Sequence, residues 1–252
     1  MKNNLLKIGS VIAVAGLLFA ACKKDGSSAQ STGSSKLDIS VKADNASTAL
    51  TNNVSTDVSG TTLTTQSSAG ANVTWTAGTA TISRFEFEAK RNDMDIEVRS
   101  KKLTSVDLFA PVPASISVLL DTGLYKEIEI RAVLAKDTGN TIPLILKGNY
   151  TTSTGTVVPI EIDYNDPGVI KTEVKDVTVN STTNLSTVIT MHLSRLLNHV
   201  SAASLDAAVK TNGTIVISNS VNKNIYNIIR SNIEGCGEDN GFDRHNRGDH
   251  DH

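Results

Sequence analysis

The stretch Phe85–Arg99, FEFEAKRNDMDIEVR, alternates apolar and charged residues on both sides of Asn92-Asp93. Such alternation around a two-residue turn predicts an antiparallel β-hairpin. The register set by this turn brings apolar residues together on one face and opposite charges together on the other, except where Glu88 meets Glu97. A slip of one residue would lose both matches, so the hairpin predicts one buried and one solvated face.

The same alternation recurs along the chain, with turn residues between the segments. Pro143 cannot donate a ladder hydrogen bond. We therefore expect either that its strand lies at a sheet edge or that the strand begins at the proline. In the segment 170–179, Ile170 and Val174 have one parity and Val177 and Val179 have the other. A β-bulge near Lys175-Asp176 would reconcile them. Residues 43–70 predict a long loop with one weak edge strand. The expected strands are 37–42, 73–76, 106–109, 116–120, 128–134, 142–146, 158–164, 170–179, 188–193 and 215–217.

The last fifth of the chain changes to helical spacing. Apolar residues recur at this spacing over Leu193–Val200, an alanine-rich stretch follows, and another apolar stripe covers Ile225–Ile233. Asn222 is the predicted N-cap of the last helix and Gly235 its C-terminal stop. Together with regularly spaced strands, these helices predict a mainly β protein: an antiparallel β-sandwich with short C-terminal helices.

Composition and motifs exclude several function classes. Lys and Arg number 24 against 26 Asp and Glu, a formal net charge of −2, which is not the basic balance of a nucleic-acid-binding protein. Aromatic residues are 4% of the chain, so valine, isoleucine and leucine must build the core. The sequence lacks the motifs of serine hydrolases, zinc proteases and phosphate-binding loops. We therefore expect no enzymatic activity and no cofactor.

The N-terminus has the pattern of a secretory signal. Lys2 and Lys7 make it positive, an apolar run covers Ile8–Phe19, and two alanines precede Cys22. The run of about a dozen residues is too short for a membrane-spanning helix. Residues 1–21 are therefore predicted to be a signal peptide.

The segment Leu17–Cys22, LLFAAC, resembles the lipobox of bacterial lipoproteins. The resemblance implies a diacylglycerol thioether on Cys22 and an N-acyl chain, and two or more chains anchor a protein stably. Lys23 stands where an aspartate would retain a lipoprotein at the inner membrane, so it implies the outer membrane. Lysine followed by Asp25 partly resembles the surface-export signal of Bacteroidota lipoproteins, which leaves periplasm-facing and cell-surface locations open. Ordinary cleavage after Ala21, without lipid, is the alternative.

A second resemblance concerns the body of the protein. The segments VDLF at Val106–Phe109 and GLYKEIEI at Gly123–Ile130 are similar to an uncharacterised domain of bacterial envelope lipoproteins. The resemblance implies an immunoglobulin- or transthyretin-like sandwich and assigns no catalytic residue. The predicted organisation is a lipoprotein signal peptide (1–21), a flexible tether (22–35), a β-sandwich domain with C-terminal helices (36–235) and a disordered Asp/His-rich tail (236–252).

Few residues of the body suggest chemistry. His192 and His199 are seven residues apart, which is two helical turns and too far to share one metal ion, so we interpret both as boundary residues of an amphipathic helix. Trp75 is either a core residue or an exposed ring that stacks on a sugar. If Cys22 carries lipid, Cys236 lacks an intramolecular partner and either pairs between molecules or stays free.

The C-terminal tail is the candidate metal site. Asp249-His250-Asp251-His252, together with His245, alternates carboxylate and imidazole ligands that suit weak binding of Zn²⁺, Ni²⁺ or Cu²⁺. The spacing excludes an EF-hand, because Cys236 and Arg247 would fill its first and last ligand positions. A disordered, solvating tail that binds no metal is the alternative.

These features predict a non-enzymatic outer-membrane lipoprotein whose body is a binding or structural module. Its expected partners are the lipid bilayer, through the acyl chains on Cys22, and an envelope glycan or protein. Two alternatives stay open: divalent metal binding by the tail, and a fimbrial or adhesin-type subunit. The second is disfavoured because Lys36 is the only basic residue between Lys24 and the first strand, where such subunits carry a basic cleavage site.

Overall fold

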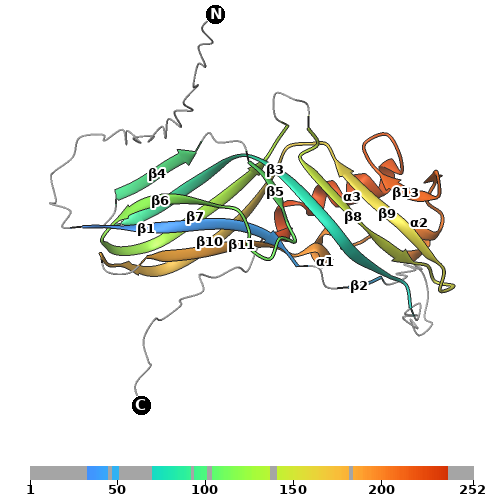
Figure 1. Cartoon of the computed structure of the whole chain (residues 1–252), viewed down its shortest axis with the longest axis horizontal. Helices are drawn as coiled ribbons and strands as arrows, with labels where there is room; N and C mark the ends of the chain where they lie inside the picture. Colours follow the sequence, from blue (N-terminus) through green and yellow to red (C-terminus); the bar gives the residue numbers. More distant parts are fainter. Residues whose placement is uncertain are drawn as a thin grey trace, which may run out of the picture. The chain divides into compact units, whose positions relative to one another are not determined.

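The computed structural model describes residues 33–44, 47–50, 70–91, 94–100, 104–136, 141–181 and 184–237. Over these ranges the chain is mainly β, as predicted, with short helices near its C-terminal end (Figure 1). A ten-stranded sheet and a three-stranded sheet make up the fold. No helix within the described ranges is long and apolar enough to cross a membrane.

The larger sheet is built along one long strand, β3 (Asn72–Arg91). β7 (Gly123–Leu134) and β8 (Leu144–Thr151) pair with it one after the other. Both lie along the same edge of β3, because the Thr81 N–H donates to the Pro143 carbonyl at 2.8 Å while the Thr81 carbonyl accepts from the Ala135 N–H at 3.3 Å. β9 (Val157–Tyr164) and β10 (Gly168–Val179) then pair with β8 and β7 in the same end-to-end fashion.

The opposite edge of β3 carries β4 (Met94–Ser100), β5 (Thr104–Asp107) and β2 (Thr48–Ala49). The strands change at about the same level of the sheet. β3 has a register shift between Ile82 and Arg84, and near it β4 gives way to β5 on one edge and β7 to β8 on the other. The sheet is therefore divided into a β4–β3–β7–β10 half and a β3–β8–β9 half. Figure 1 shows the labels of these two groups on either side of the middle of β3.

The predicted hairpin is confirmed in its register. Phe87 pairs with Val98, Ala89 with Ile96, and Glu88 meets Glu97. The turn at Asn92-Asp93 lies outside the described residues. Pro143 directly precedes β8, as its missing N–H requires. The predicted change of parity in β10 is confirmed, because Ile170 is buried on one parity and Val177 and Val179 on the other, with Asp176 between them in a left-handed conformation (φ 56°). The predicted bulge is wrong, since Lys175 pairs with Glu127 and Val177 with Tyr125, so that the register has the same offset on both sides of Asp176.

The smaller sheet has the order β11–β1–β6, formed by Leu185–Met191, Ser34–Ala43 and Ser115–Asp121. Its inward residues join those of the larger sheet in one buried apolar cluster, so the two sheets pack as a sandwich. The strand orientation is mixed rather than all antiparallel, because β1 runs parallel to β11 and β9 runs parallel to β13 (Thr214–Ile217). β1 begins at Ser34, two residues before the expected domain boundary.

The C-terminal segment covers the β8–β9 half through short elements. Tyr150 of β8 donates from its hydroxyl to Asp206 Oδ1 at 2.7 Å, and the rings of Tyr164 (β9) and Tyr226 stack with centroids 5.9 Å apart. The elements are α1 (Leu193–Leu196), α2 (Ala202–Asp206), β12 (Lys210–Thr211), β13, α3 (Lys223–Asn232) and the 3₁₀ turn η1 (Glu234–Cys236).

Two details of this segment differ from expectation. α1 is a single turn, since the chain bends into a left-handed conformation at His199 (φ 65°). Asn222 stands at the N-cap position of α3 but makes no cap hydrogen bond. Its side chain instead accepts from the Val209 N–H at 2.9 Å and donates to the Val216 carbonyl at 2.7 Å, which links β13 to the chain that follows α2.

Candidate functional site

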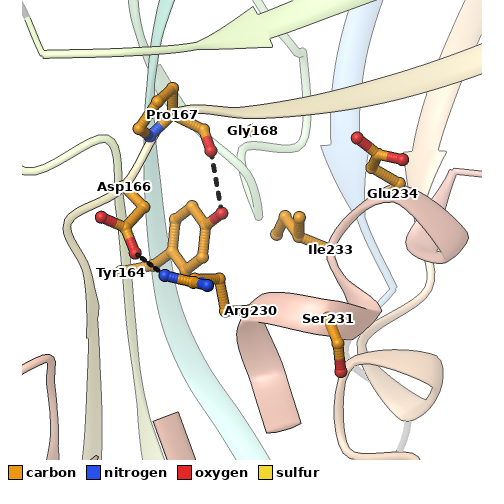
Figure 2. Close-up of a pocket in the computed structure, with 8 residues that line it drawn as sticks. All are labelled: Tyr164, Asp166, Pro167, Gly168, Arg230, Ser231, Ile233 and Glu234. Atoms are coloured by element: carbon orange, nitrogen blue, oxygen red, sulfur yellow. Dashed lines mark hydrogen bonds and ion pairs between the residues drawn. The ribbon is translucent and has the colours of Figure 1, made fainter. Parts of the chain in front are cut away.

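A shallow crevice of about 490 Å³ lies where the β9–β10 junction meets α3 and η1 (Figure 2). The two sides of the crevice are about sixty residues apart in sequence, so only the tertiary fold brings them together. The turn Asp166-Pro167-Gly168 was visible in the sequence, but nothing local indicated what it faces. The lining residues are Tyr164, Asp166, Pro167, Gly168, Arg230, Ser231, Ile233 and Glu234.

Hydrogen bonds within the protein hold the wall of the crevice in place. Tyr164 donates its hydroxyl to the Pro167 carbonyl at 3.0 Å. Tyr226 donates to Asp166 Oδ2 at 3.0 Å and accepts from the Asn165 N–H at 3.1 Å. The Tyr226 bonds tie α3 to the β9–β10 junction, and the Tyr164 bond closes the junction itself, so both phenols have a structural role.

The electrostatics of the crevice agree with that role. Burial, reinforced by Tyr226 and Asp166, raises the pKa of Tyr164 to about 12, and burial also raises the pKa of Tyr226. Both phenols therefore stay protonated at neutral pH and act as donors, not as bases. Arg230 Nη1 lies 3.6 Å from Asp166 Oδ2, and its side chain is 60% exposed.

The chemical capacity of the crevice is correspondingly small. The Ser231 hydroxyl is engaged with the Ile228 carbonyl at 2.7 Å, and neither histidine nor cysteine lines the crevice. The lining thus lacks a nucleophile held by a base, the arrangement that covalent catalysis requires. It offers solvent one guanidinium and the Glu234 carboxylate.

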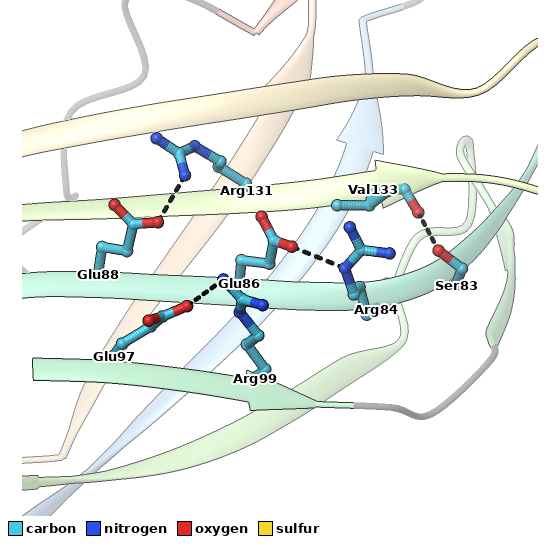
Figure 3. Close-up of polar contacts among 8 residues, drawn as sticks. All are labelled: Ser83, Arg84, Glu86, Glu88, Glu97, Arg99, Arg131 and Val133. Carbon is cyan, nitrogen blue, oxygen red and sulfur yellow. Dashed lines mark hydrogen bonds and ion pairs between the residues drawn. The ribbon is translucent and has the colours of Figure 1, made fainter.

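The outer face of the β4–β3–β7–β10 half is a second candidate surface (Figure 3). Register places four glutamates in one row across the four strands: Glu97, Glu88, Glu129 and Glu173. The neighbouring row, in the same strand order, is Arg99, Glu86, Arg131 and Lys171. An acidic row thus lies beside a largely basic one, which could not be seen without the pairing of all four strands.

Ion pairs between the two rows offset the like charges. Arg131 Nη1 lies 2.6 Å from Glu88 Oε1, and Arg131 also pairs with Glu129 along β7. Arg84 Nε lies 2.7 Å from Glu86 Oε1, and this bond lowers the pKa of Glu86 with smaller help from Arg99 and Arg131. The face is therefore a set of mutually paired charges rather than a free acidic cluster.

Replacement of Glu97 tests the acidic row. Glu97→Lys should stabilise the protein by about 0.2–1 kcal/mol at low salt, because it puts a cation opposite Glu88. The pair that Glu97 makes with Arg99 is lost, but both side chains are at least half exposed, so that pair contributes little. The reverse sign is expected for Asp95→Lys on the same strand, since Asp95 faces Lys90. Urea unfolding at low and high salt measures both changes. Equal signs for the two variants would contradict the observed register.

His192 and His199, the two histidines predicted at the helix boundary, lie in different environments. His192 Nδ1 lies 2.8 Å from Asp44 Oδ2, and the other carboxylate oxygen of Asp44 accepts from the Leu193 N–H at 2.9 Å. Asp44 thereby caps the start of α1, a role that the sequence did not indicate. His199 lies exposed in the turn after α1. Within the described ranges, no group of three or more metal-ligating side chains comes together.

Trp75 belongs to the core. It is 2% exposed on the inner face of β3, so the alternative of an exposed ring stacking on a sugar is wrong. The parity of β3 decides this, because Val73 and Trp75 face inward while Thr74 faces outward.

Cys236 is also buried, in η1, where its thiol donates to the Asn232 carbonyl at 3.3 Å. Burial raises the pKa of this thiol to about 12. The thiolate is the reactive form, so at pH 8 only about one molecule in ten thousand carries it. We expect no labelling by iodoacetamide in the native protein and rapid labelling in urea. Equal rates in both conditions would show that the thiol is accessible.

Several predicted site residues lie outside the described residues: Cys22, His245, Asp249, His250, Asp251 and His252. The lipidation of Cys22 and the metal binding by the tail therefore stay predictions. Comparison with known proteins adds no relative, since no family model, no curated protein and no solved structure matches this chain.

Proposed function

We propose that this chain is a lipid-anchored protein of the bacterial outer membrane and that its β-sandwich is a non-enzymatic binding or structural module. The observation that carries the proposal is Cys22, placed directly after a short apolar segment and two alanines. Acyl chains on this cysteine would hold the body at the bilayer. An envelope glycan or protein is the proposed partner of the body.

Features of the body support a non-enzymatic role. The phenols at the crevice are used in structural bonds, Tyr164 within the β9–β10 junction and Tyr226 between that junction and α3, and the charges of the outer sheet face are paired with one another. β1 begins at Ser34, soon after the proposed anchor, so little chain is left for another domain between them.

Fatty-acid labelling tests the anchor. Cells that express the full chain with an alkyne-tagged palmitate should yield a labelled protein that partitions into the Triton X-114 detergent phase. Cys22→Ser should abolish both the label and the partitioning, because it removes the acylated sulfur. Cys236→Ala, the matched control at the other cysteine, should keep both. A label that persists in Cys22→Ser would refute the proposal.

Fractionation of the same cells tests the location. The labelled protein is expected in the outer-membrane band of a sucrose gradient, and recovery in the inner-membrane band would contradict the outer-membrane assignment. Protease treatment of intact cells then distinguishes the two faces, since only a surface-exposed body would be digested.

A further inference from the structure

Exposed apolar side chains gather at one end of the body. Among the described residues, Leu119 is 72%, Leu124 51% and Met94 41% exposed. Single exposed apolar residues are ordinary on protein surfaces, whereas a group of them at one place suggests a contact surface. The other large apolar side chains exposed in the described ranges are Val112, Val157 and Val209.

Strand pairing shows that the three residues share one end of the sandwich. Leu119 and Leu124 lie on either side of the turn between β6 and β7. Met94 pairs with Arg91, and Arg91 in turn pairs with Tyr125, the neighbour of Leu124. We call this group of Met94, Leu119 and Leu124 the tether end.

The turn at the tether end is held firmly. Arg91 donates to the Thr122 carbonyl at 3.0 Å and pairs with Asp121 at 3.3 Å. Tyr125 donates its hydroxyl to the Asp121 carbonyl at 2.9 Å. Gly123 has a φ of 147°, and a Cβ there would approach Arg91 Cδ to 3.0 Å, so the close packing uses the lack of a side chain. The fold therefore presents the two leucines on a fixed support.

The chain from Cys22 enters the body at this same place. The Thr122 N–H donates to the Gly33 carbonyl at 3.1 Å, and Ser34 pairs with Asp121. The predicted tether from Cys22 to Gly33 spans on the order of 20 Å as a flexible coil. Figure 1 shows β1 beginning at the end of the body where β6 and β7 meet. A lipid on Cys22 thus keeps a bilayer close to the tether end.

The opposite end of the body lies far from the place where the chain enters it at Gly33. Val157 begins β9, next to the turn that leaves β8. The successive strands β7 and β8, of 12 and 8 residues, run from Gly123 to that turn, roughly 60 Å along the strands. Val157 is 60% exposed, close to the value for Leu124, and is a matched position outside the reach of the tether.

We propose that the tether end is a membrane-contact surface, at which Leu119 and Leu124 enter the interface of the bilayer that holds the lipidated Cys22. This inference rests on the proposed lipid anchor. Apolar side chains enter the boundary between headgroups and acyl chains when an anchor holds them near it. The contact adds a second attachment point and thereby orients the body on the membrane.

Site-specific fluorescence tests the contact with the full-length lipidated protein. L119C, L124C and V157C are labelled with an NBD probe and reconstituted in vesicles of phosphatidylethanolamine, phosphatidylglycerol and cardiolipin. The native cysteines do not interfere, since the Cys22 sulfur would be a thioether and Cys236 is 0% exposed. Doxyl-labelled lipids should quench the probes at 119 and 124 at least about threefold more than the probe at 157.

The outcomes separate this inference from the lipid anchor. Mass spectrometry of the N-terminal peptide shows whether Cys22 carries diacylglycerol, and its absence would overturn both the anchor and the contact. If the lipid is present but all three probes are quenched equally, the contact is overturned and the anchor stands. A third outcome is that the emission of the probes at 119 and 124 changes without quenching by the lipids, and that crosslinking yields a dimer. This outcome would assign the tether end to a second copy and overturn the membrane contact.

Discussion

Gly148→Ala is expected to destabilise the folded body by about 3 kcal/mol or to prevent folding. A Cβ at Gly148 would lie 2.3 Å from the Thr74 carbonyl oxygen and 3.0 Å from Trp75 Cα. Both contacts are with backbone, so no side chain can rotate away to relieve them. The close approach exists because β3 changes register between Trp75 and Ala77, opposite Gly148 of β8.

Gly235→Ala is the matched control. Nothing lies within 4 Å of a Cβ at Gly235, and its φ is outside the left-handed region. The stability of this variant should change by no more than about 0.5 kcal/mol. Urea unfolding followed by circular dichroism compares the two midpoints. Similar midpoints for both variants would refute the close packing of β3 against β8.

Phe87→Ala is the second large effect, expected to cost about 3–5 kcal/mol. Phe87 is 2% exposed on the inner face of β3 and belongs to the cluster that both sheets share. Its removal would leave a cavity in a core with few aromatic rings. Since single domains are stable by about 5–15 kcal/mol, the variant should lose a large share of its stability.

The neighbouring residue supplies the control. Glu88 lies on the outer face, where its half-exposed side chain pairs with Arg131. Exposed ion pairs contribute little, so Glu88→Ala should change the free energy of unfolding by no more than about 1 kcal/mol. Thermal and urea unfolding of both variants measures the difference. Equal destabilisation at 87 and 88 would contradict the predicted alternation of faces.

The local sequence pattern was sufficient to predict the hairpin and the features that lie within single strands. The register of Phe85–Arg99 follows from a two-residue turn and from the period of two, both of which act between neighbours in sequence. The change of parity in β10 near Asp176 was visible in the sequence, and the start of β8 was visible as a proline. Each of these depends on backbone geometry over a few residues.

Partners distant in sequence were not predicted. Trp75 and Phe85 lie on the same strand, β3, yet the sequence suggested separate strands, because the register shift near Ile82 interrupts the alternation. The parallel pairing of Leu37 with Leu185 joins residues almost 150 positions apart, and periodicity carries no information about which strand lies alongside. The crevice, the glutamate row and the tether end all depend on such pairings.

The sequence by itself determined the mainly β class and the alternation within the strands, since these depend on composition and on nearest neighbours, and it predicts the lipid-anchor signal at Cys22. The metal-binding tail, with His245 and Asp249–His252, is likewise a prediction from sequence alone. Only the tertiary structure decided that Trp75 and Cys236 are buried, and that Leu119, Leu124 and Met94 share the end at which β1 begins. The physical reason is that burial and exposure depend on which surfaces pack together, and that packing is set by contacts between residues far apart in the chain.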